Sequence, residues 1–419
     1  MDDKDAQPPK VDLSDRPRTG EGVWLNQDVI GLGVNRFLSD FGHEAGTAIL
    51  PLFLTAIGAP AFALGAIEGI ADALSSFAKL FGGWLGDRVE RRRPWAAAGY
   101  LLTGVTTGLY GLFAAWPWTL LVRTLGWAGR GVRSPLHDAL LTDSVPVSAR
   151  GRAFGFDEAA DTAGAVAGPL GALAVIGLVA PEGHLRAFNI VFLLAAIPGV
   201  LAALSITVLV RERPHPILRG ATFAGSLRML PNSYRRYLAG VFVFGCGDFS
   251  HTMLIMYAVQ SLAPHLGQGA GAVAIQLYAL HNLLYAVGAY PAGMLADRFG
   301  KRRFLIAAYF LAALTNVLLI ALAPSTLMLG LVFAIAGAVY AFQQSLERAI
   351  AADVAPVEVR STAFGVLASV NGIGDLISSA IVGALWTAFS PTVAFSYALA
   401  VSGAGAITTI IALRKPSAI

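Results

Sequence analysis

The chain alternates between long apolar runs and short polar segments over almost its whole length. An apolar run of about 20 residues can cross the roughly 30 Å hydrocarbon core of a bilayer as one α-helix. The pattern therefore predicts an all-α membrane protein with twelve transmembrane helices. These helices are expected near residues 27–57, 61–86, 94–115, 118–141, 153–180, 186–210, 236–262, 270–297, 302–323, 325–353, 361–389 and 391–413.

Basic residues gather in alternate connections between these runs. The even-numbered connections are rich in arginine, whereas the odd-numbered ones hold little charge apart from Glu182 and Arg186. Lys and Arg stay on the cytoplasmic side of an inner membrane, so the even connections and both termini are predicted to be cytoplasmic. Residues 1–24 are polar, lack an apolar core and read as a disordered cytoplasmic tail, and residues 415–419 form a second tail.

Composition agrees with this pattern and removes several classes of protein. Of all residues, 56% are hydrophobic and 13% are charged, whereas a soluble domain carries about 25% charged residues. The net charge of +4 follows from the cytoplasmic arginines, so no nucleic-acid partner is expected. The single Cys246 excludes a disulfide framework. No phosphate loop, nucleophile elbow or zinc-protease helix occurs, so neither an enzyme nor a cofactor is expected.

Two blocks of sequence recur at a constant offset of 210 residues. This repeat predicts two six-helix bundles, 25–210 and 236–414, joined by a basic cytoplasmic linker, 211–235. Parallel repeats of this kind are related by a pseudo-twofold axis along the membrane normal and place a binding site between the halves. The first block runs from Gly83 to Arg92 and recurs from Gly293 to Arg302, and the second runs from Asp143 to Gly155 and recurs from Asp353 to Gly365.

The first block carries a family resemblance. Residues 83–92 read GWLGDRVERR and residues 293–302 read GMLADRFGKR. Both resemble the G-x-L-x-D-R-x-G-R-R loop motif of the major facilitator superfamily, and only the first copy departs from it, at Glu90. The resemblance implies a transporter whose gating residues include Asp87, Arg88, Arg92, Asp297, Arg298 and Arg302. For the outermost arginines, Arg91 and Arg93, a purely topogenic role is an equal alternative.

A second resemblance concerns the direction of transport. Residues 164–171 read GAVAGPLG and resemble the G-x-x-x-G-P-x-x-G motif of major facilitator exporters, which are mostly proton antiporters. The last glycine of the motif is replaced or shifted, because Ala172 follows Gly171. The resemblance implies export by proton exchange, with Gly164, Gly168 and Pro169 as gating residues. Ordinary packing of small residues between membrane helices is the alternative explanation.

Many ionisable residues lie inside the predicted helices, where they cost free energy unless they face a cavity or a partner. Internal ion pairs account for some of them, with Asp72 close to Lys79 and Arg36 close to Asp40. Protonation of Asp40, Glu44, Asp72 or Asp161 could compete with a cationic substrate and so couple two flows. The candidate substrate-binding and proton-binding residues are Asp40, His43, Glu44, Glu68, Asp72, Asp157, Asp161, Asp248, His251, His281 and Asp375.

One pattern offers an alternative substrate. Asp40-Phe41-Gly42-His43 on helix 1 is matched by Asp248-Phe249-Ser250-His251 on helix 7. Two carboxylates and two imidazoles suit Fe, Mn, Co, Ni or Zn. The sequence thus leaves two hypotheses open: a monomeric exporter of a small cationic or lipophilic compound, or a transporter of a divalent transition metal bound by these four residues. A lone His281 is expected to pack or to hydrogen-bond.

Overall fold

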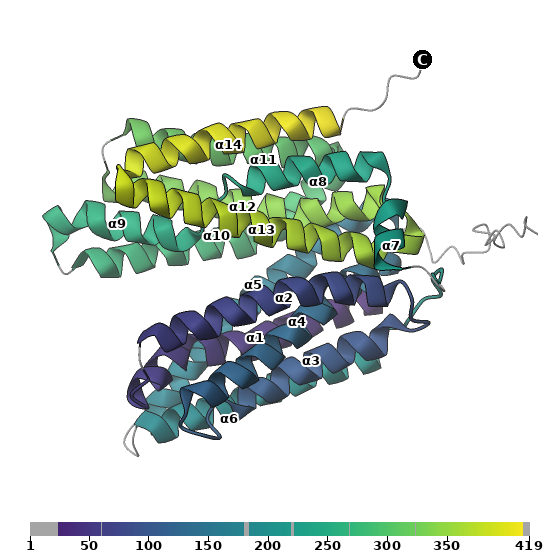
Figure 1. The fold of residues 1–419 in the computed structure, drawn as a ribbon, viewed down its shortest axis with the longest axis horizontal. Coiled ribbons are helices and arrows are strands. Elements are labelled where there is room, and N and C mark those ends of the chain that lie inside the picture. The colour runs from purple at the N-terminus through teal and green to yellow at the C-terminus, as the bar shows by residue number, and fades with distance from the viewer. Residues whose placement is uncertain are drawn as a thin grey trace, which may run out of the picture.

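The structure is a computed structural model, and it describes residues 24–59, 61–179, 184–218, 222–267, 269–322 and 324–413. The tails expected at 1–24 and 415–419 fall outside these residues, apart from Trp24. In the described residues the chain folds into two helical bundles that lie side by side (Figure 1). The N-half comprises α1 Gln27–Ala56, α2 Ala61–Gly86, α3 Arg92–Leu109, α4 Trp116–Ser144, α5 Arg150–Val179 and α6 His184–Leu209.

A short helix, α7 Phe223–Met229, belongs to the linker between the bundles. The C-half then repeats the N-half, with one difference described below. The C-half comprises α8 Asn232–Gly245, α9 His251–Leu266, α10 Gly269–Phe299, α11 Lys301–Ala321, α12 Thr326–Val354, α13 Arg360–Ala388 and α14 Pro391–Ala412.

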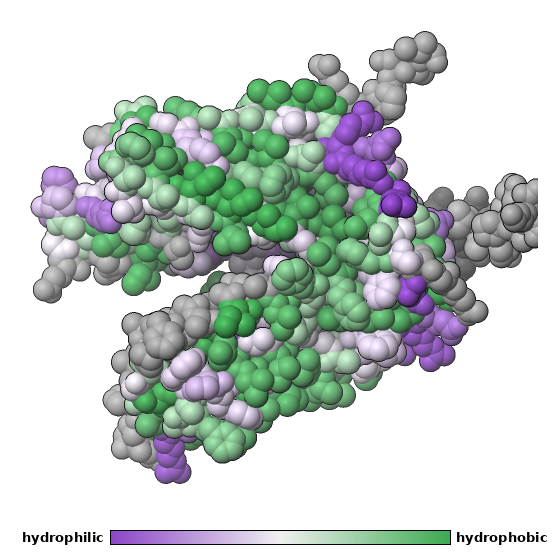
Figure 2. All heavy atoms as spheres, in the orientation of Figure 1, coloured by the Kyte–Doolittle hydropathy of each residue, from purple (hydrophilic) through white to green (hydrophobic). Residues whose placement is uncertain are grey.

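The twelve predicted membrane helices are confirmed, with helix 7 split into α8 and α9. Six helices in the described residues are long and apolar enough by composition alone to cross a membrane, and all of them lie at or after α5. Helices that carry more charge, such as α1 with Arg36, Asp40 and Glu44, fall below that criterion. Figure 2 shows why they still suit a bilayer, because hydrophobic residues cover the flanks of both bundles.

The break in helix 7 was not predicted. Residues 246–250 leave the helical conformation between Gly245 and His251. Gly, Asp and Ser all have low helix propensity, since glycine is flexible and the short polar side chains compete with the backbone. Ser379 of α13 receives a hydrogen bond from the Ser250 N–H at 3.2 Å and so satisfies one donor freed by the break.

The predicted third helix also ends earlier than expected, at Leu109 rather than near residue 115. Trp118 explains this end, because its indole N–H donates to the Leu109 carbonyl at 2.8 Å. The carbonyl is one of the groups that a helix end leaves without an intrahelical partner. Pro117 then lies in the first turn of α4, where proline is well tolerated.

The two halves meet at one end and separate at the other (Figure 1). The contacts between halves join α5 to α10 and α12, and α13 to α2 and α4. We call the closed end the Arg-rich end, because it carries the basic connections after α2, α4, α10 and α12. At the opposite end, Figure 2 shows a hollow between the bundles.

Candidate gating and substrate sites

The loop motif and its copy build two equivalent latches between the halves at the Arg-rich end. Asp87 accepts hydrogen bonds from the backbone N–H groups of Ser361 and Thr362, at 2.8 and 2.7 Å. These groups belong to the first turn of α13, whose positive dipole end favours a carboxylate. Burial raises the pKa of Asp87, and Arg92 and the two backbone donors oppose this effect.

Asp297 repeats this arrangement on the other side of the pseudo-twofold axis. Its carboxylate accepts from the N–H groups of Gly151 and Arg152, both at 2.9 Å, in the first turn of α5. Each latch therefore joins a loop of one half to a helix start of the other half. The expectation that these two aspartates act at the contact between halves agrees with the geometry.

The glycines of the motif explain why these helices approach so closely. A Cβ atom added at Gly83 would lie 2.5 Å from the Ser361 carbonyl oxygen, and one added at Gly293 would lie 2.0 Å from the Gly151 carbonyl oxygen. Both distances are far below van der Waals contact, so any larger residue would force the halves apart at this end. The glycines thus set the distance at which Asp87 and Asp297 reach their partners.

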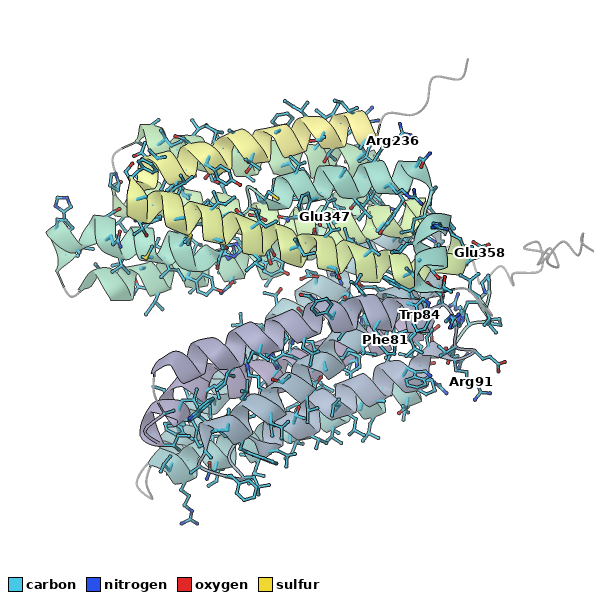
Figure 3. The ribbon with its side chains drawn as sticks, in the orientation of Figure 1. Phe81, Trp84, Arg91, Arg236, Glu347 and Glu358 are labelled. Atoms are coloured by element: carbon cyan, nitrogen blue, oxygen red, sulfur yellow. The ribbon has the colours of Figure 1, made fainter. Side chains whose placement is uncertain are left out.

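Ion pairs from the second repeated block reinforce the same end. Arg150 of the N-half pairs with Asp353 of the C-half at 2.8 Å, and its counterpart Arg360 pairs with Asp143 of the N-half. Arg92 also contacts Asp143, at 2.8 Å. Figure 3 shows the polar side chains gathered at this end. These acids were not among the predicted site residues, although the repeat itself marked their positions.

The other predicted motif arginines have local partners. Arg88 stacks over Trp84, with 4.3 Å from guanidinium carbon to ring centre. Arg302 donates to the Ile410 carbonyl at 2.9 Å, and Arg298 lies 5.1 Å from the Phe299 ring. Arg302 therefore contacts α14 within the C-half. Arg92 also stays within its own half, but its partners Asp87 and Asp143 are acids that bind the C-half.

The linker between the halves packs against the first motif loop. The Leu218 N–H donates to the Asp87 carbonyl at 2.9 Å, and the His215 ring contacts the Val89 carbonyl at 3.0 Å. Burial and the neighbouring Arg92 lower the pKa of His215. Glu212 accepts from the Arg93 N–H at 3.2 Å, at the start of α3. The connection is thus fixed to the loop that forms one latch.

Deeper in the molecule, Arg348 of α12 joins the halves through a buried charge cluster. Its guanidinium contacts Asp138 and Asp157, both at 3.1 Å, and Glu158. All three acids belong to the N-half, on α4 and α5. Tyr285 of α10 donates to Glu158 as well. Sequence reasoning did not select Arg348, but a signal existed: Asp138 and Arg348 lie 210 positions apart and carry opposite charges.

The remaining buried acids of the N-half also pair with arginines, though not with those predicted. Asp40 pairs with Arg130 of α4 at 3.0 Å rather than with Arg36. Arg36 instead reaches across to α5, where it contacts Asp157 at 3.4 Å and Asp161 at 3.3 Å. Residues one turn apart on a helix share a face. Here that face of α1 packs against α4 and α5, and Asp40 and Arg36 each pair with a residue of these helices instead of with each other.

Gly164 and Gly168 continue the same face of α5 as Asp157 and Asp161, and they pack against α1. A Cβ atom at Gly164 would lie 2.4 Å from the Phe37 carbonyl oxygen, and one at Gly168 would lie 2.4 Å from the Phe41 carbonyl oxygen. These two acids and two glycines therefore lie along one face of α5, and that face packs against α1. Pro169 follows inside the same continuous helix.

The acids of the C-half have neutral partners. Asp248 accepts from the Gln343 amide at 3.2 Å, and Glu347 accepts from the Tyr309 hydroxyl at 2.6 Å and the Asn371 amide at 2.7 Å. Asp375 lies exposed on α13. The side chains of Glu68 and Asp72, which sequence reasoning also selected, lie outside the described residues.

The structure does not bring the repeated Asp-Phe-x-His residues together as a metal site. The Asp40 carboxylate is already paired with Arg130. Asp248 lies in the break of helix 7, before α9 begins at His251, so the two residues do not share a helix face as expected. His43 packs edge-on against Trp127, with 5.2 Å between ring centres, and lies 4.0 Å from Glu44. Within the described parts of the chain, no three His, Cys, Asp or Glu side chains form a group that could hold a metal ion.

His251 and His281 instead belong to a cluster of rings in the C-half. Their ring centres are 4.3 Å apart, and Tyr340 lies 4.9 Å from His251. Tyr340 in turn lies 4.9 Å from Tyr285, the residue that donates to Glu158. The expectation that His281 packs agrees with its buried position. These rings connect the interior of the C-half to the charge cluster between the halves.

The fold, the repeat and the latches define a class of protein, and comparison with known proteins agrees with it. The family model of the Major Facilitator Superfamily matches residues 32–258 and 238–418. The chain belongs to this superfamily and is a multi-pass membrane transporter rather than an enzyme.

Two relatives are similar to this chain in sequence, and a solved structure is similar to it in fold. A protein of Methanocaldococcus jannaschii, described as an MFS-type transporter, is 30% identical over 373 residues, which cover 89% of this chain and 92% of the relative. A Mycobacterium tuberculosis protein is 30% identical over 365 residues, covering 84% of this chain and 85% of its own. The fucose transporter FucP in the outward conformation superposes with a TM-score of 0.77 at 14% identity, over 94% of this chain and all 100% of that one.

Proposed function

We propose that this chain is a proton-coupled secondary transporter that exports a small cationic or lipophilic substrate by alternating access. The observation that carries the proposal is the asymmetry between its two ends. The halves are joined at the Arg-rich end by two equivalent latches, and a hollow separates them at the other end. This is one of the two end states that rocking of two repeats around a central site requires.

The distribution of charge supports our orientation of the chain in the membrane. The Arg-rich end faces the cytoplasm by the positive-inside rule, and both termini then lie on that side. In this orientation the hollow opens outwards. The likeness to FucP in the outward conformation supports the assignment. Residues 25–210 and 236–414 are the two rocking units, and the linker 211–235 connects them on the cytoplasmic side.

Proton coupling is best placed at the Arg348 cluster. Arg348 of the C-half is held by Glu158, Asp157 and Asp138 of the N-half, so these contacts join the halves in the closed state of the Arg-rich end. Neutralisation of one of these acids would remove a charge that holds Arg348. Proton uptake from outside would therefore weaken the cytoplasmic closure, which favours opening towards the inside.

The direction of substrate flow rests on two features. The G-x-x-x-G-P stretch at Gly164–Pro169 resembles that of exporters, and its glycines pack α5 against α1 beside the coupled acids. A cationic substrate and a proton would compete for negative charge in the same cavity, which is the requirement for exchange. No observation favours the divalent-metal alternative.

Flux measurements test this proposal. Proteoliposomes with an acidic interior should accumulate ethidium, a lipophilic cation whose amino groups carry N–H donors, and a protonophore should abolish the uptake. Arg348→Gln should lose the uptake, whereas Glu358→Gln, an exposed carboxyl at the same end, should keep it. Uptake that is independent of the proton gradient, or an absence of ethidium uptake in the wild type, would overturn the proposal.

A further inference from the structure

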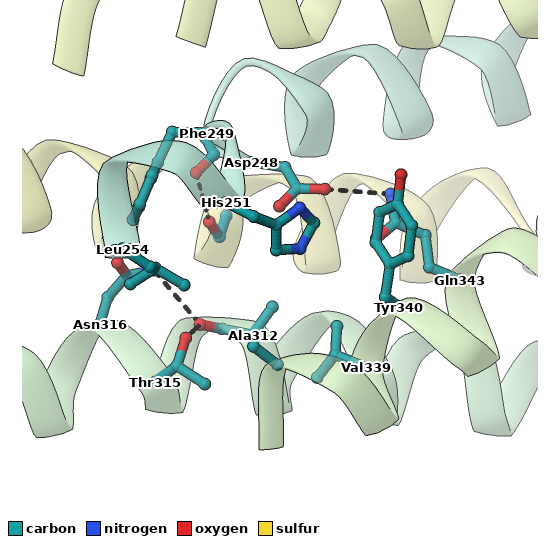
Figure 4. A pocket seen from close by; sticks show the side chains of 13 residues that line it. Asp248, Phe249, His251, Leu254, Ala312, Thr315, Asn316, Val339, Tyr340 and Gln343 are labelled. Carbon is teal, nitrogen blue, oxygen red and sulfur yellow. Dashed lines mark hydrogen bonds between the residues drawn. The ribbon is translucent and has the colours of Figure 1, made fainter. Parts of the chain in front are cut away.

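A polar cavity lies inside the C-half, beside the break in helix 7. It is lined by residues from the break and from α9, α11, α12 and α14, including Asp248, His251, Asn316, Tyr340 and Gln343. Figure 4 shows the Asp248 carboxyl joined to Gln343, with the rings of His251 and Tyr340 nearby. Its volume of about 40 Å³ exceeds the 10 to 15 Å³ or so that one water requires.

The lining is rich in hydrogen-bond acceptors. The amide oxygens of Gln343 and Asn316 are buried and have no hydrogen-bond partner in the described chain. Their amide nitrogens are already used, by Asp248 and by the Ala312 carbonyl respectively. A buried acceptor without a partner costs about 1 to 3 kcal/mol. The cavity thus holds acceptors without a partner, and no lysine or arginine is among its lining residues.

The internal repeat shows which group the C-half lacks. In the N-half, Asp40 of helix 1 is neutralised by Arg130 of α4. Asp248 is the counterpart of Asp40, but the residue 210 positions after Arg130 is Tyr340. The residue 210 positions after Arg133 is Gln343, which is also neutral. The C-half therefore keeps the carboxylate and replaces the two arginines that surround its counterpart.

We infer that this cavity binds the protonated amine of the transported substrate, which takes the place that the Arg130 guanidinium holds in the N-half. An ammonium group with N–H donors satisfies Asp248 by charge and the neighbouring Gln343 oxygen by a hydrogen bond. The rings of Tyr340 and His251 add cation–π and apolar contact. This inference rests on the proposed function, because it names the chemical class of its substrate.

The position of the cavity connects binding to gating. Tyr340 lines the cavity and packs against Tyr285, which donates to Glu158 in the Arg348 cluster. A cation held beside Tyr340 is thus separated from the charges that close the Arg-rich end by two aromatic rings. Binding in the C-half and proton uptake in the N-half are coupled through this row of contacts.

Three alkyl compounds with the same tail distinguish the ligand classes. Calorimetry on the purified full chain would use hexylammonium, hexyltrimethylammonium and hexanol, with sodium chloride as a fourth titrant. We expect saturable heat with hexylammonium and affinity at least about tenfold weaker for the quaternary ion, which has no N–H donor. Equal affinity for the quaternary ion, saturable heat with sodium chloride, or no heat with hexylammonium would each overturn the inference.

Variants locate the site. Asp248→Asn and Gln343→Leu should each weaken hexylammonium binding by about tenfold or more, because a charged or buried hydrogen bond is lost. Tyr340→Arg should abolish binding by supplying the guanidinium that the N-half has, whereas Tyr340→Phe should keep most of it. Glu358→Gln is the matched control, and size-exclusion profiles show that each variant is folded. Unchanged binding in both Asp248→Asn and Tyr340→Arg would place the amine elsewhere.

Failure of this inference differs from failure of the proposed transport. Hexylammonium binding that survives Asp248→Asn and Tyr340→Arg, with proton-driven ethidium uptake in the wild type, would remove the amine site and leave the transporter. Hexylammonium binding that is lost in Asp248→Asn, without any proton-driven flux in the wild type, would keep the site and remove the coupling.

Discussion

The two halves of this transporter share a fold but treat their buried acids differently. In the N-half, Asp40 and Asp161 are held by arginines of neighbouring helices. In the C-half, Asp248 and Glu347 are held by amide and hydroxyl groups without charge. The repeat preserves helix packing, whereas the charges have diverged. We infer that the N-half uses these acids to hold its own helices together, and that the C-half keeps its acids for a ligand or a proton.

Removal of Arg348 should have the largest effect on this comparison, because it removes the cation that three acids of the N-half share. Removing one partner of a buried ion pair lowers the free energy of unfolding by about 3 to 5 kcal/mol. We expect Arg348→Gln to lower the melting temperature of the purified protein and to abolish proton-driven flux. Arg236→Gln, at an exposed arginine of α8 that contacts the Asn232 carbonyl of its own helix, is the control. A melting temperature equal to that of the wild type would show that the cluster does not join the halves.

Neutralisation of one acid in each half should give unequal results. Asp157→Asn leaves Arg36 and Arg348 without one of their charges, so a loss of about 3 kcal/mol is expected. Glu347→Gln keeps size and hydrogen bonding beside neutral partners and should cost less than about 1 kcal/mol. Thermal unfolding of both variants in the same detergent measures the difference. Equal losses would mean that Glu347 is also held by charge and would remove the contrast.

The packing of α5 against α1 should respond to a single methyl group. Gly168→Ala places a carbon 2.4 Å from the Phe41 carbonyl oxygen and should destabilise the N-half by about 1 to 3 kcal/mol. Gly177→Ala lies on the same helix, with nothing within 4 Å, and should be neutral or stabilising by about 0.5 kcal/mol. Melting temperatures that fall equally in both variants would contradict close packing at the exporter-like motif.

The latches should produce the smallest individual effects. Asp87→Asn and Asp297→Asn each lose one of two backbone hydrogen bonds at a helix start, which costs about 1 to 2 kcal/mol. Flux should fall in each variant while membrane insertion stays normal. The two latches share no partner, so the double variant should lose about the sum. Wild-type flux in both single variants at equal expression would remove their gating role.

Much of this architecture could be predicted from sequence. The length of an apolar run predicts a membrane-spanning helix, and the repeat predicts two equivalent bundles. The twelve helices, the two bundles and the motif loops follow from them. Partners across helices could not be predicted in this way. Helical spacing put Arg36 beside Asp40, but which neighbouring helix offers Arg130 depends on how the bundle packs. The break at 246–250 could not be predicted, because apolar residues continue on both sides of it and indicate one continuous helix.

The central claim is that the Arg-rich end and the opposite end open in alternation, and two distances test it directly. Spin labels on a Cys246→Ser background would be placed at Arg91 and Arg236, at the Arg-rich end of the two halves (Figure 3), and in a second sample at Leu112 and Leu327, near the opposite end. When Arg348→Gln breaks the cluster, we expect the first distance to lengthen and the second to shorten. If both distances lengthen together, or if neither changes, the alternating-access account is contradicted.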